Sequence, residues 1–198
     1  MSDFTSAALL AGGKSRRMGF DKQMFHIHDY KLFDNVLRTL TERFEDVMVV
    51  TQCPEMYRGM NVRSISDIIP GFGPLSGIHA AIREAKSEYV YVIACDMPRI
   101  NLNYIDYMVH NIKSSPDACV TKKGSWIEPF HAFYGKQALP VIEADLYAGK
   151  ASVYYMLQKI NTLYIPEADA RRFTPDWSLF CNLNTIEDYT SAYAAWEA

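Results

Sequence analysis

The sequence lacks a strong excess of basic residues and any long apolar run. Its formal net charge is −3 over 198 residues, which argues against the dominant basic surface that nucleic-acid binding requires. A local basic pocket for a phosphorylated small molecule remains compatible with that charge. No apolar stretch approaches the roughly 20 residues that span a bilayer, and the N-terminus lacks the features of a signal peptide. We therefore expect a cytoplasmic protein with no nucleic-acid or membrane partner.

The sequence also lacks closely spaced cysteines. Its four cysteines are widely scattered and form no CxxC pair: Cys53, Cys95, Cys119 and Cys181. In a chain without a secretion signal, this pattern favours reduced thiols in the core over disulfides or zinc ligands.

Repeats, low-complexity stretches and linkers are absent from the sequence as well. The apolar fraction is 49% and the charged fraction 22%, close to the averages for soluble globular proteins. A chain of this length suits one well-buried core. We therefore expect a single domain over residues 1–198.

Short apolar runs alternate with helix-like segments along the first half of the chain. The runs at 5–10, 47–50, 62–65 and 89–94 suit buried strands, while 34–44 and 78–85 have helical spacing. This alternation predicts an α/β fold with a mainly parallel sheet covered on both faces. Ligands bind such sheets at the carboxyl ends of the strands, so these positions are the candidate sites.

The second half of the chain is less regular. Residues 101–112 have helical spacing, 118–121 and 130–134 favour strands, and 152–160 predict an amphipathic helix. Thr185 could cap a final helix over 186–193, with Asp188 as an imperfect capping-box partner.

The first candidate site follows the first apolar run. Its paired glycines, Gly12 and Gly13, let backbone N–H groups approach a ligand without interference from a Cβ atom. The segment then supplies three cations, Arg16, Arg17 and Lys22. Their charge and donors suit a triphosphate. A glycine turn followed by a solvated basic face is the alternative; cations and glycines this close to a strand end favour phosphate binding.

The second candidate site covers Asp67 to Gly77. It holds three glycines and two prolines within eight positions, which fix an irregular backbone before a helix. Asp67 follows a predicted strand and could accept hydrogen bonds from a base or a ribose. An ordinary rigid loop would show the same turn chemistry.

The third candidate site is Asp96, after the most apolar run. A carboxylate at the end of a buried strand is costly unless a partner compensates it. Mg²⁺ bridging phosphate oxygens is one such partner, because it prefers hard oxygen ligands. The alternative is that Asp96 caps the helix that begins near Asn101, but Pro98 lies between them and makes that reach awkward.

These three segments, in this order, resemble the MobA family of molybdenum cofactor guanylyltransferases. The matching pieces are Leu10-Ala11-Gly12-Gly13, Ser15-Arg16-Arg17-Met18-Gly19, Asp21-Lys22, Gly71-Phe72-Gly73-Pro74-Leu75-Ser76-Gly77-Ile78 and Cys95-Asp96-Met97-Pro98. The late Asn182-Leu183-Asn184-Thr185 stretch resembles the family's NxNT motif, and Glu128-Pro129 before a strand also fits. The resemblance runs from residue 5 to about residue 190. The first motif is shared by many sugar and alditol nucleotidyltransferases, whereas the four motifs together are specific.

The resemblance implies a three-layer Rossmann-like nucleotidyltransferase fold and a Mg²⁺-dependent reaction. GMP would pass from GTP to molybdenum-bound molybdopterin, and pyrophosphate would be released. The product would pass through transient contacts to molybdenum cofactor maturation proteins or molybdoenzymes. Attack by a phosphate that is already an anion demands no general base, so alignment and charge neutralisation are the main needs.

The resemblance also assigns roles to individual residues. Asp96 would ligate Mg²⁺ and, with Arg16, Arg17 and Lys22, form the catalytic group. The nucleotide would contact Leu10, Ala11, Gly12, Gly13, Lys22, Thr51, Asp67 and Asp96. Thr51 stands where the family usually has Asn, and it can still hydrogen-bond. Asn182 and Asn184 would lie on the acceptor side.

Three alternatives remain open. A cytidylyltransferase would make the cytosine form of the cofactor, but its relatives tend to have LAAG where this chain has LAGG, so Gly12 favours guanine. A transferase could act on another phosphorylated acceptor. An inactive relative could bind the cofactor without chemistry, although the glycine loop, Lys22 and Asp96 argue against it.

The five histidines show no triad or metal spacing. Of the three tryptophans, only Trp126 is a candidate for a place near a site.

Overall fold

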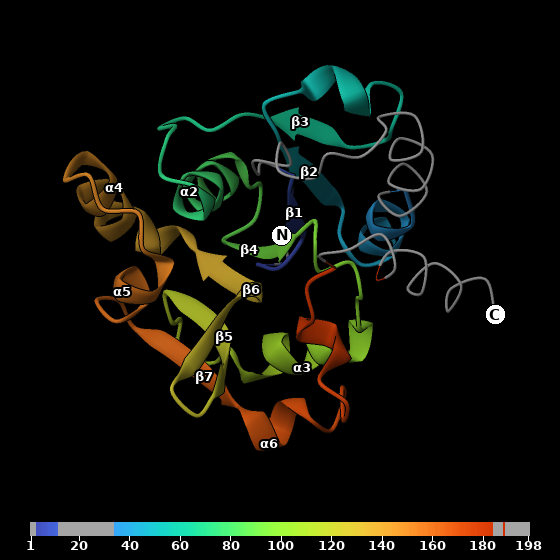
Figure 1. Ribbon diagram of the computed structural model, residues 1–198, viewed down its shortest axis with the longest axis vertical. Coiled ribbons are helices and arrows are strands. Elements are labelled where there is room, and N and C mark those ends of the chain that lie inside the picture. The colour runs from blue at the N-terminus through green and yellow to red at the C-terminus, as the bar shows by residue number, and fades with distance from the viewer. Residues whose placement is uncertain (1–2, 12–33, 184–187, 189–198) are drawn as a thin grey trace.

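A seven-stranded sheet forms the centre of the computed structural model, which describes residues 3–11, 34–183 and 188 (Figure 1). The strand order is β3-β2-β1-β4-β6-β5-β7. The strands are β1 (Ser6–Leu10), β2 (Asp46–Val50), β3 (Arg63–Ile65), β4 (Tyr89–Ala94), β5 (Ala118–Lys123), β6 (Trp126–Gly135) and β7 (Thr162–Pro166).

One strand runs against the others. β1 pairs in parallel with β2 and β4, β2 with β3, and β5 with β7, whereas β6 is antiparallel to both β4 and β5. The prediction of a mainly parallel sheet is therefore confirmed.

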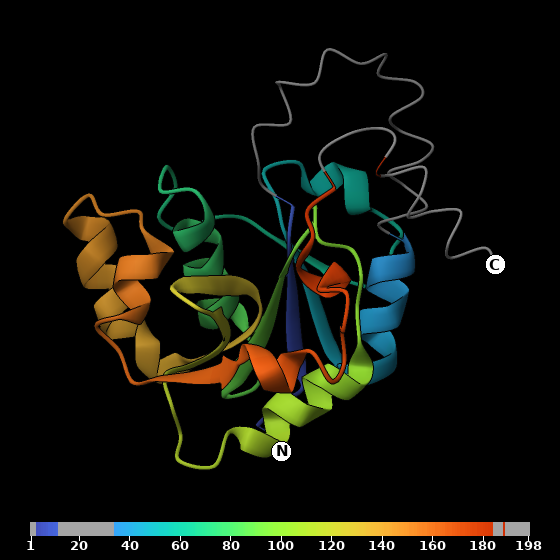
Figure 2. The ribbon, with the colours of Figure 1, turned by 60° about the horizontal axis from the view of Figure 1, so that its bottom comes forward.

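Helices cover both faces of the sheet, as Figure 2 shows. Residues 34–43 are helical. The other helices are α2 (Pro74–Glu84), α3 (Leu102–Asn111), α4 (Leu139–Tyr147), α5 (Val153–Leu157) and α6 (Glu167–Ala170), with short 3-10 helices η2 (Pro54–Tyr57), η3 (Lys136–Ala138) and η4 (Ser178–Phe180). Helix 34–43, α3, α6 and η4 contribute to one apolar cluster, and α2, α4 and α5 to the other. The predicted three-layer fold is confirmed.

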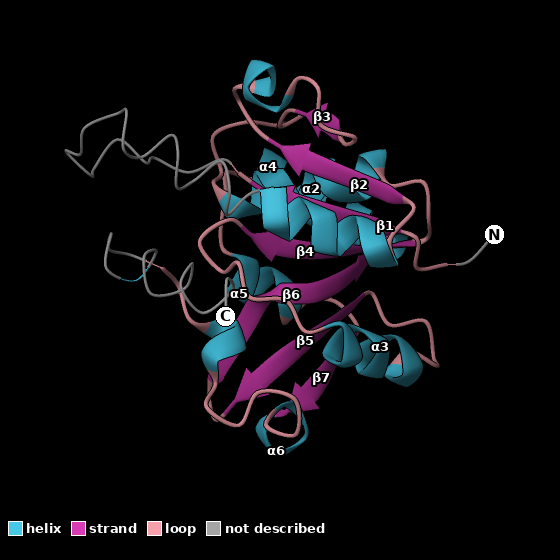
Figure 3. Cartoon of the chain, turned by 90° about the vertical axis from the view of Figure 1, so that its right-hand side faces the viewer, coloured by secondary structure: helices cyan, strands magenta, loops and turns pink. Residues whose placement is uncertain are grey.

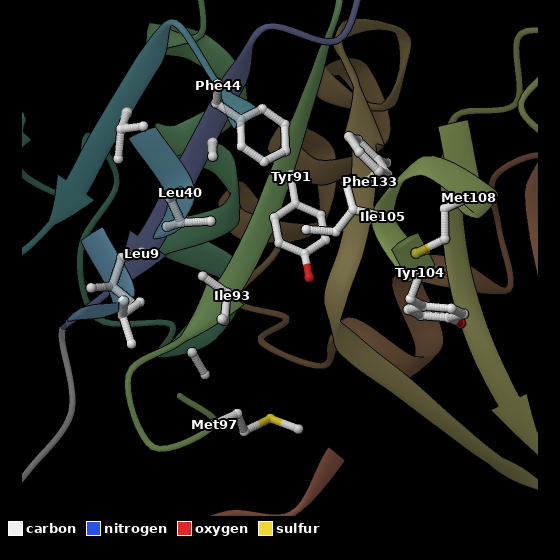
Figure 4. Packing of buried hydrophobic residues seen from close by; sticks show 14 of the residues in the cluster. Leu9, Leu40, Phe44, Tyr91, Ile93, Met97, Tyr104, Ile105, Met108 and Phe133 are labelled. Carbon is white, nitrogen blue, oxygen red and sulfur yellow. The ribbon is translucent and has the colours of Figure 1, made fainter. Parts of the chain in front are cut away.

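The two clusters follow from the alternation of side chains along the strands. In β4, Val90 and Val92 point to the α2 side, while Tyr91 and Ile93 point to the other side. Tyr91 and Phe133 pack side by side in the cluster that includes helix 34–43 and α3, with ring centroids 5.2 Å apart (Figure 4). Each fully buried large side chain contributes about 1.5–3 kcal/mol to folding.

Several predicted boundaries need correction. Strand 89–94 and helix 101–112 match β4 and α3 closely, and the Asn101 side chain caps α3 by accepting a hydrogen bond from the Tyr104 N–H. α2 begins at Pro74 rather than Ile78, because Gly73 and Pro74 supply the turn that starts it. The helix predicted over 152–160 corresponds to α5, which is only five residues long and is capped by Ser152. α4 and β7 were not predicted.

A buried carboxylate joins three strands at the end of the sheet where β1 and β2 begin. Asp46 accepts hydrogen bonds from the Ser6 hydroxyl at 2.8 Å and from the Arg63 guanidinium at 2.9 and 3.0 Å. Burial alone would raise the pKa of Asp46, but the bonds from Arg63 and Ser6 hold it below its ordinary value. These bonds stabilise the end of the sheet where the parallel strands begin. The candidate functional residues follow the opposite ends of these strands.

All four cysteines are free thiols. Cys119 is buried and Cys95 half-buried, but Cys53 and Cys181 are exposed. The prediction of core thiols is therefore wrong for these two, because Cys53 follows β2 into a loop and Cys181 follows η4. Within the described ranges, no helix is long and apolar enough to cross a membrane.

Candidate functional site

Four parallel strands end together at one edge of the sheet. Leu10, the last residue of β1, is in register with Val50 of β2 and with Ala94 of β4. Val50 is in turn in register with Ile65 of β3. The arrowheads of β2 and β4 lie on the same side of the molecule in Figure 3. The residues after these strands, which the sequence singled out, therefore meet at this edge.

The backbone after β1 is held on both sides. The Ala11 N–H donates to the Val50 carbonyl at 2.9 Å, and the Leu10 carbonyl accepts from the Cys95 N–H at 3.1 Å. Gly77 of α2 lies against Leu10: a Cβ at this glycine would be 3.2 Å from Leu10 Cδ2. The close approach that glycine permits brings the second candidate segment next to the first.

The start of α2 depends on glycine backbone geometry. Gly71 has φ +102°, and Gly73, the N-cap of α2, has φ +58° and ψ −135°. A residue with a side chain rarely adopts these backbone angles. The Phe72 N–H donates to the Ser76 hydroxyl at 3.1 Å and closes the turn. The segment is thus a specific loop that presents the N-terminus of α2 at the strand-end edge.

Thr51 and Asp67 lie in two neighbouring loops that are bonded to each other. Gln52 donates to Asp67 Oδ2 at 3.3 Å, and the Ser66 hydroxyl donates to the Thr51 carbonyl at 3.0 Å. The Thr51 hydroxyl accepts from the Cys53 N–H at 3.0 Å and can still donate a hydrogen bond. Burial raises the pKa of Asp67, opposed by the bond from Gln52 and the charge of His79.

Asp96 lies just beyond β4, at the centre of this edge. It does not cap α3, because Asn101 takes that role. Its side chain is half-buried, and burial raises the pKa of the carboxyl. Its carbonyl accepts a hydrogen bond from the Leu183 N–H at 2.7 Å, which brings the late segment that contains Asn182 to the same place.

A second carboxyl, Glu128 of β6, was not assigned a role from the sequence. It is only 6% exposed and accepts a hydrogen bond from the Phe130 N–H at 3.1 Å. Its pKa is raised to about 7, mainly by burial and also by the nearby charge of Asp96, while interactions with the Phe130 N–H and the Trp126 side chain partly oppose the rise. A buried carboxyl close to another at a strand-end edge is typical of functional sites.

An irregularity in β6 sets the position of Glu128. Thr121 pairs with Glu128, but Cys119 pairs with Phe133, so extra β6 residues bulge between these points. Within the bulge, His131 has φ +48° and is fully buried, with Nδ1 2.8 Å from the Tyr91 hydroxyl. Burial lowers the pKa of His131 to about 4, so this imidazole is neutral at pH 7. Bulges beside functional sites commonly redirect side chains.

The two carboxyls can accommodate a cation. Among the residues that the structure describes, neither Asp96 nor Glu128 forms an ion pair with a lysine, arginine or histidine. In the same ranges, no group of three or more His, Cys, Asp or Glu residues could hold a metal. Mg²⁺ at nucleotide sites is usually held by one or two carboxylates with phosphates and water, so this pair fits a nucleotide-bound Mg²⁺.

The structure therefore brings together six of the predicted residues at one edge: Leu10, Ala11, Thr51, Asp67, Asp96 and Asn182. The other predicted site residues lie outside the described residues: Gly12, Gly13, Arg16, Arg17, Lys22 and Asn184. The predicted final helix 186–193 also lies outside them, except for residue 188. Their roles stay predictions.

Comparison with known proteins gives a consistent result. Residues 7–162 match the family model of the MobA-like NTP transferase domain. The chain is 49% identical over 191 residues to a "Probable molybdenum cofactor guanylyltransferase" of Peptoclostridium acidaminophilum, covering 93% of this chain and 86% of that protein. It is 48% identical over 187 residues to the "Molybdenum cofactor guanylyltransferase" of Syntrophotalea carbinolica, covering 94% and 89%.

A solved structure shares the fold over nearly the whole chain. It is that of the molybdopterin-guanine dinucleotide biosynthesis protein A of Archaeoglobus fulgidus, with a TM-score of 0.80 and 26% identity. The match covers 97% of this chain and 98% of the other.

Proposed function

The chain belongs to the family of MobA-like NTP transferase domains, and on that premise we propose that it transfers GMP from GTP to molybdenum-bound molybdopterin and releases pyrophosphate. The observation that carries the proposal is the position of Asp96. This half-buried carboxyl lies after the central strand β4, beside the end of β1 and the late segment at Leu183. It is the place where a nucleotide and an acceptor phosphate could meet.

The nucleotide would occupy the side of the edge formed by β1, β2 and β3. The backbone of Leu10 to Gly13 would contact the guanine nucleotide, and Asp67 and Thr51 would contact the nucleoside. A base or ribose that donates to Asp67 would compensate the burial that raises the pKa of this carboxyl. Lys22, with Arg16 or Arg17, would hold the phosphates and stabilise the leaving pyrophosphate.

We propose Mg²⁺ as the cofactor, held by Asp96 with Glu128 beside it. When bound, the ion would neutralise charge on the nucleotide phosphates. Desolvation of Asp96 and the absence of an ion-pair partner among the described residues support a cation at this point. The attacking oxygen of the acceptor phosphate is already an anion, so no general base is needed. The chain itself would align the two phosphates and exclude water.

The acceptor would occupy the other side of Asp96. Asn182 precedes Leu183, whose N–H is bonded to the Asp96 carbonyl, so an amide at position 182 lies near the proposed reaction centre. Asn182 and Asn184 would face the acceptor. Contacts with molybdenum cofactor maturation proteins or molybdoenzymes stay a prediction.

The test is pyrophosphate release from GTP by the purified protein, with Mg²⁺ and molybdenum-loaded molybdopterin. We expect turnover that requires all three components, and a much lower rate when CTP replaces GTP, because the chain has Gly12 in the LAGG motif. Faster turnover with CTP would identify a cytidylyltransferase. No turnover by folded protein with either nucleotide would favour an inactive cofactor-binding relative.

A further inference from the structure

Trp126 is an exposed aromatic side chain close to the proposed reaction centre. It is 63% exposed at the first residue of β6. The other exposed large aromatic side chains among the described residues are on α4 and α5: Tyr147, Tyr154 and Tyr155. Trp126 differs from them because it belongs to the strand that carries Glu128.

The Trp126 indole is connected to the site through Glu128. The two side chains are two residues apart in a strand, so they point to the same side, while Ile127 between them packs into the α2 cluster. Trp126 and Asp96 are both close enough to Glu128 to influence the pKa of its carboxyl. At 63% exposure, the indole has an open ring face and a polar N–H beside the Glu128 side chain.

The neighbouring strand adds positive charge. Lys123 of β5 is the register partner of Trp126. Its ammonium lies 4.7 Å from the centroid of the Trp177 ring and 3.9 Å from Glu167. Arg171 also lies over Trp177, at 5.2 Å. A planar, anionic molecule on Trp126 would therefore lie beside Lys123, the cation opposite Trp126 in the β5–β6 pair.

We propose that the open face of Trp126 stacks on the planar heteroaromatic ring of the acceptor. This deepens the proposed function and rests on it. The ring would be held by Trp126 while the phosphate of the same molecule reaches Asp96. Stacking on an aromatic side chain tolerates variation in the ligand's ring. The Trp126 indole would therefore select flat heterocycles as a class.

The experiment compares Trp126→Ala with Tyr155→Ala, which removes an equally exposed aromatic side chain (64%) on α5. We expect Trp126→Ala to raise the acceptor KM by about tenfold, with the KM for GTP unchanged. The same loss should appear in the Kd for molybdopterin measured by equilibrium dialysis without GTP. Trp126→Phe keeps a stacking face without the N–H, so we expect a smaller increase, about threefold. Tyr155→Ala should match the unaltered protein.

An acceptor KM and Kd within twofold of the unaltered protein in Trp126→Ala would overturn the inference, as would an equal rise in the KM for GTP. In that case the unaltered protein would still transfer GMP to molybdopterin, and the proposed function would stand. If the unaltered protein binds GTP but transfers nothing to molybdopterin, the proposed function fails, and the platform for that acceptor fails with it.

Discussion

The N–H of Leu183 donates a 2.7 Å hydrogen bond to the carbonyl of Asp96. These two residues are far apart in the sequence, and the bond holds the peptide that follows Asp96. On the β1 side, the N–H of Cys95 is bonded to Leu10 at 3.1 Å. The backbone around Asp96 is thus fixed from both directions before any ligand binds, which lowers the cost of placing the carboxyl for catalysis.

Replacing Asp96 tests the centre of the proposed mechanism. We expect Asp96→Asn and Asp96→Ala to lower kcat by about 100-fold or more, because the charge that would hold the cation at the phosphates is removed. Initial rates of pyrophosphate release measure the effect, and circular dichroism checks the fold. Asp106→Asn, which changes an exposed carboxylate on α3, is the control and should keep full activity. Near-normal rates in Asp96→Asn would remove Asp96 from the metal role.

Glu128 makes stability depend on pH. Its pKa is about 7 in the folded protein against an ordinary 4.5, so between these values the folded state binds more protons than the unfolded chain. The free energy of unfolding therefore falls as pH rises through this window, by up to about 3 kcal/mol. In Glu128→Gln we expect most of this decline to disappear.

Urea unfolding at pH 5 and pH 8, with EDTA present, measures the difference. Glu42→Gln changes an exposed glutamate in helix 34–43 and should keep the pH dependence of the unaltered protein. The same decline in Glu128→Gln as in the unaltered protein would contradict the assignment.

Gly73 should be required for nucleotide binding. An alanine at φ +58° and ψ −135° is strained by about 1–3 kcal/mol, and relief of that strain would move the first turn of α2. We expect Gly73→Ala to raise the KM for GTP severalfold. Gly149→Ala is the matched control: it has φ +76° with open space around it, in the turn between α4 and α5. It should lose similar stability and keep its KM. Equal KM values in both variants would mean that this loop does not contact the nucleotide.

Asp46 should be the most costly carboxylate to remove for stability alone. The side chain is 4% exposed and bonded to Ser6, Arg63 and the Lys86 N–H. Asp46→Asn would remove the closest anionic partner of the half-buried Arg63 guanidinium and leave it only Glu84, whose carboxylate is 3.8 Å away. We expect a loss of about 3 kcal/mol in urea unfolding. The exposed pair between Arg43 and Asp106 is the comparison, since Asp106→Asn should cost no more than about 1 kcal/mol. A loss below that of Asp106→Asn would show that the buried network is dispensable.

The parallel core could be predicted because its strands are buried on both faces. β1, β2 and β4 are continuous apolar runs in the sequence, and the carboxyl-end rule then placed Asp67 and Asp96 at one edge. The family resemblance named the nucleotide and the acceptor, which no residue pattern could supply by itself.

The region around β6 could not be predicted, because long-range pairing decides it. Pro129 interrupts the pattern of a strand, so the sequence indicated a strand only from Phe130 and left Trp126 in a loop. In the structure β6 begins at Trp126 and accommodates Pro129 at the bulge. Glu128-Pro129 was recognised in the sequence, but Glu128 was given no role for the same reason: its burial depends on pairing with Thr121 and on the bulge at His131. A glutamate directly before a proline, next to an apolar run, was the available signal.

The position of β1 in the sheet has a consequence for how the chain is made. β1 lies between β2 and β4, and it leaves the ribosome before either of these neighbours. Between Leu10 and Ala94 the ribosome adds 84 residues (94 minus 10), which takes about 4–17 s at about 5–20 residues per second. Throughout that interval an apolar strand has an unpaired side. Until β4 emerges and closes the centre of the sheet, this unpaired apolar side is open to non-native pairing.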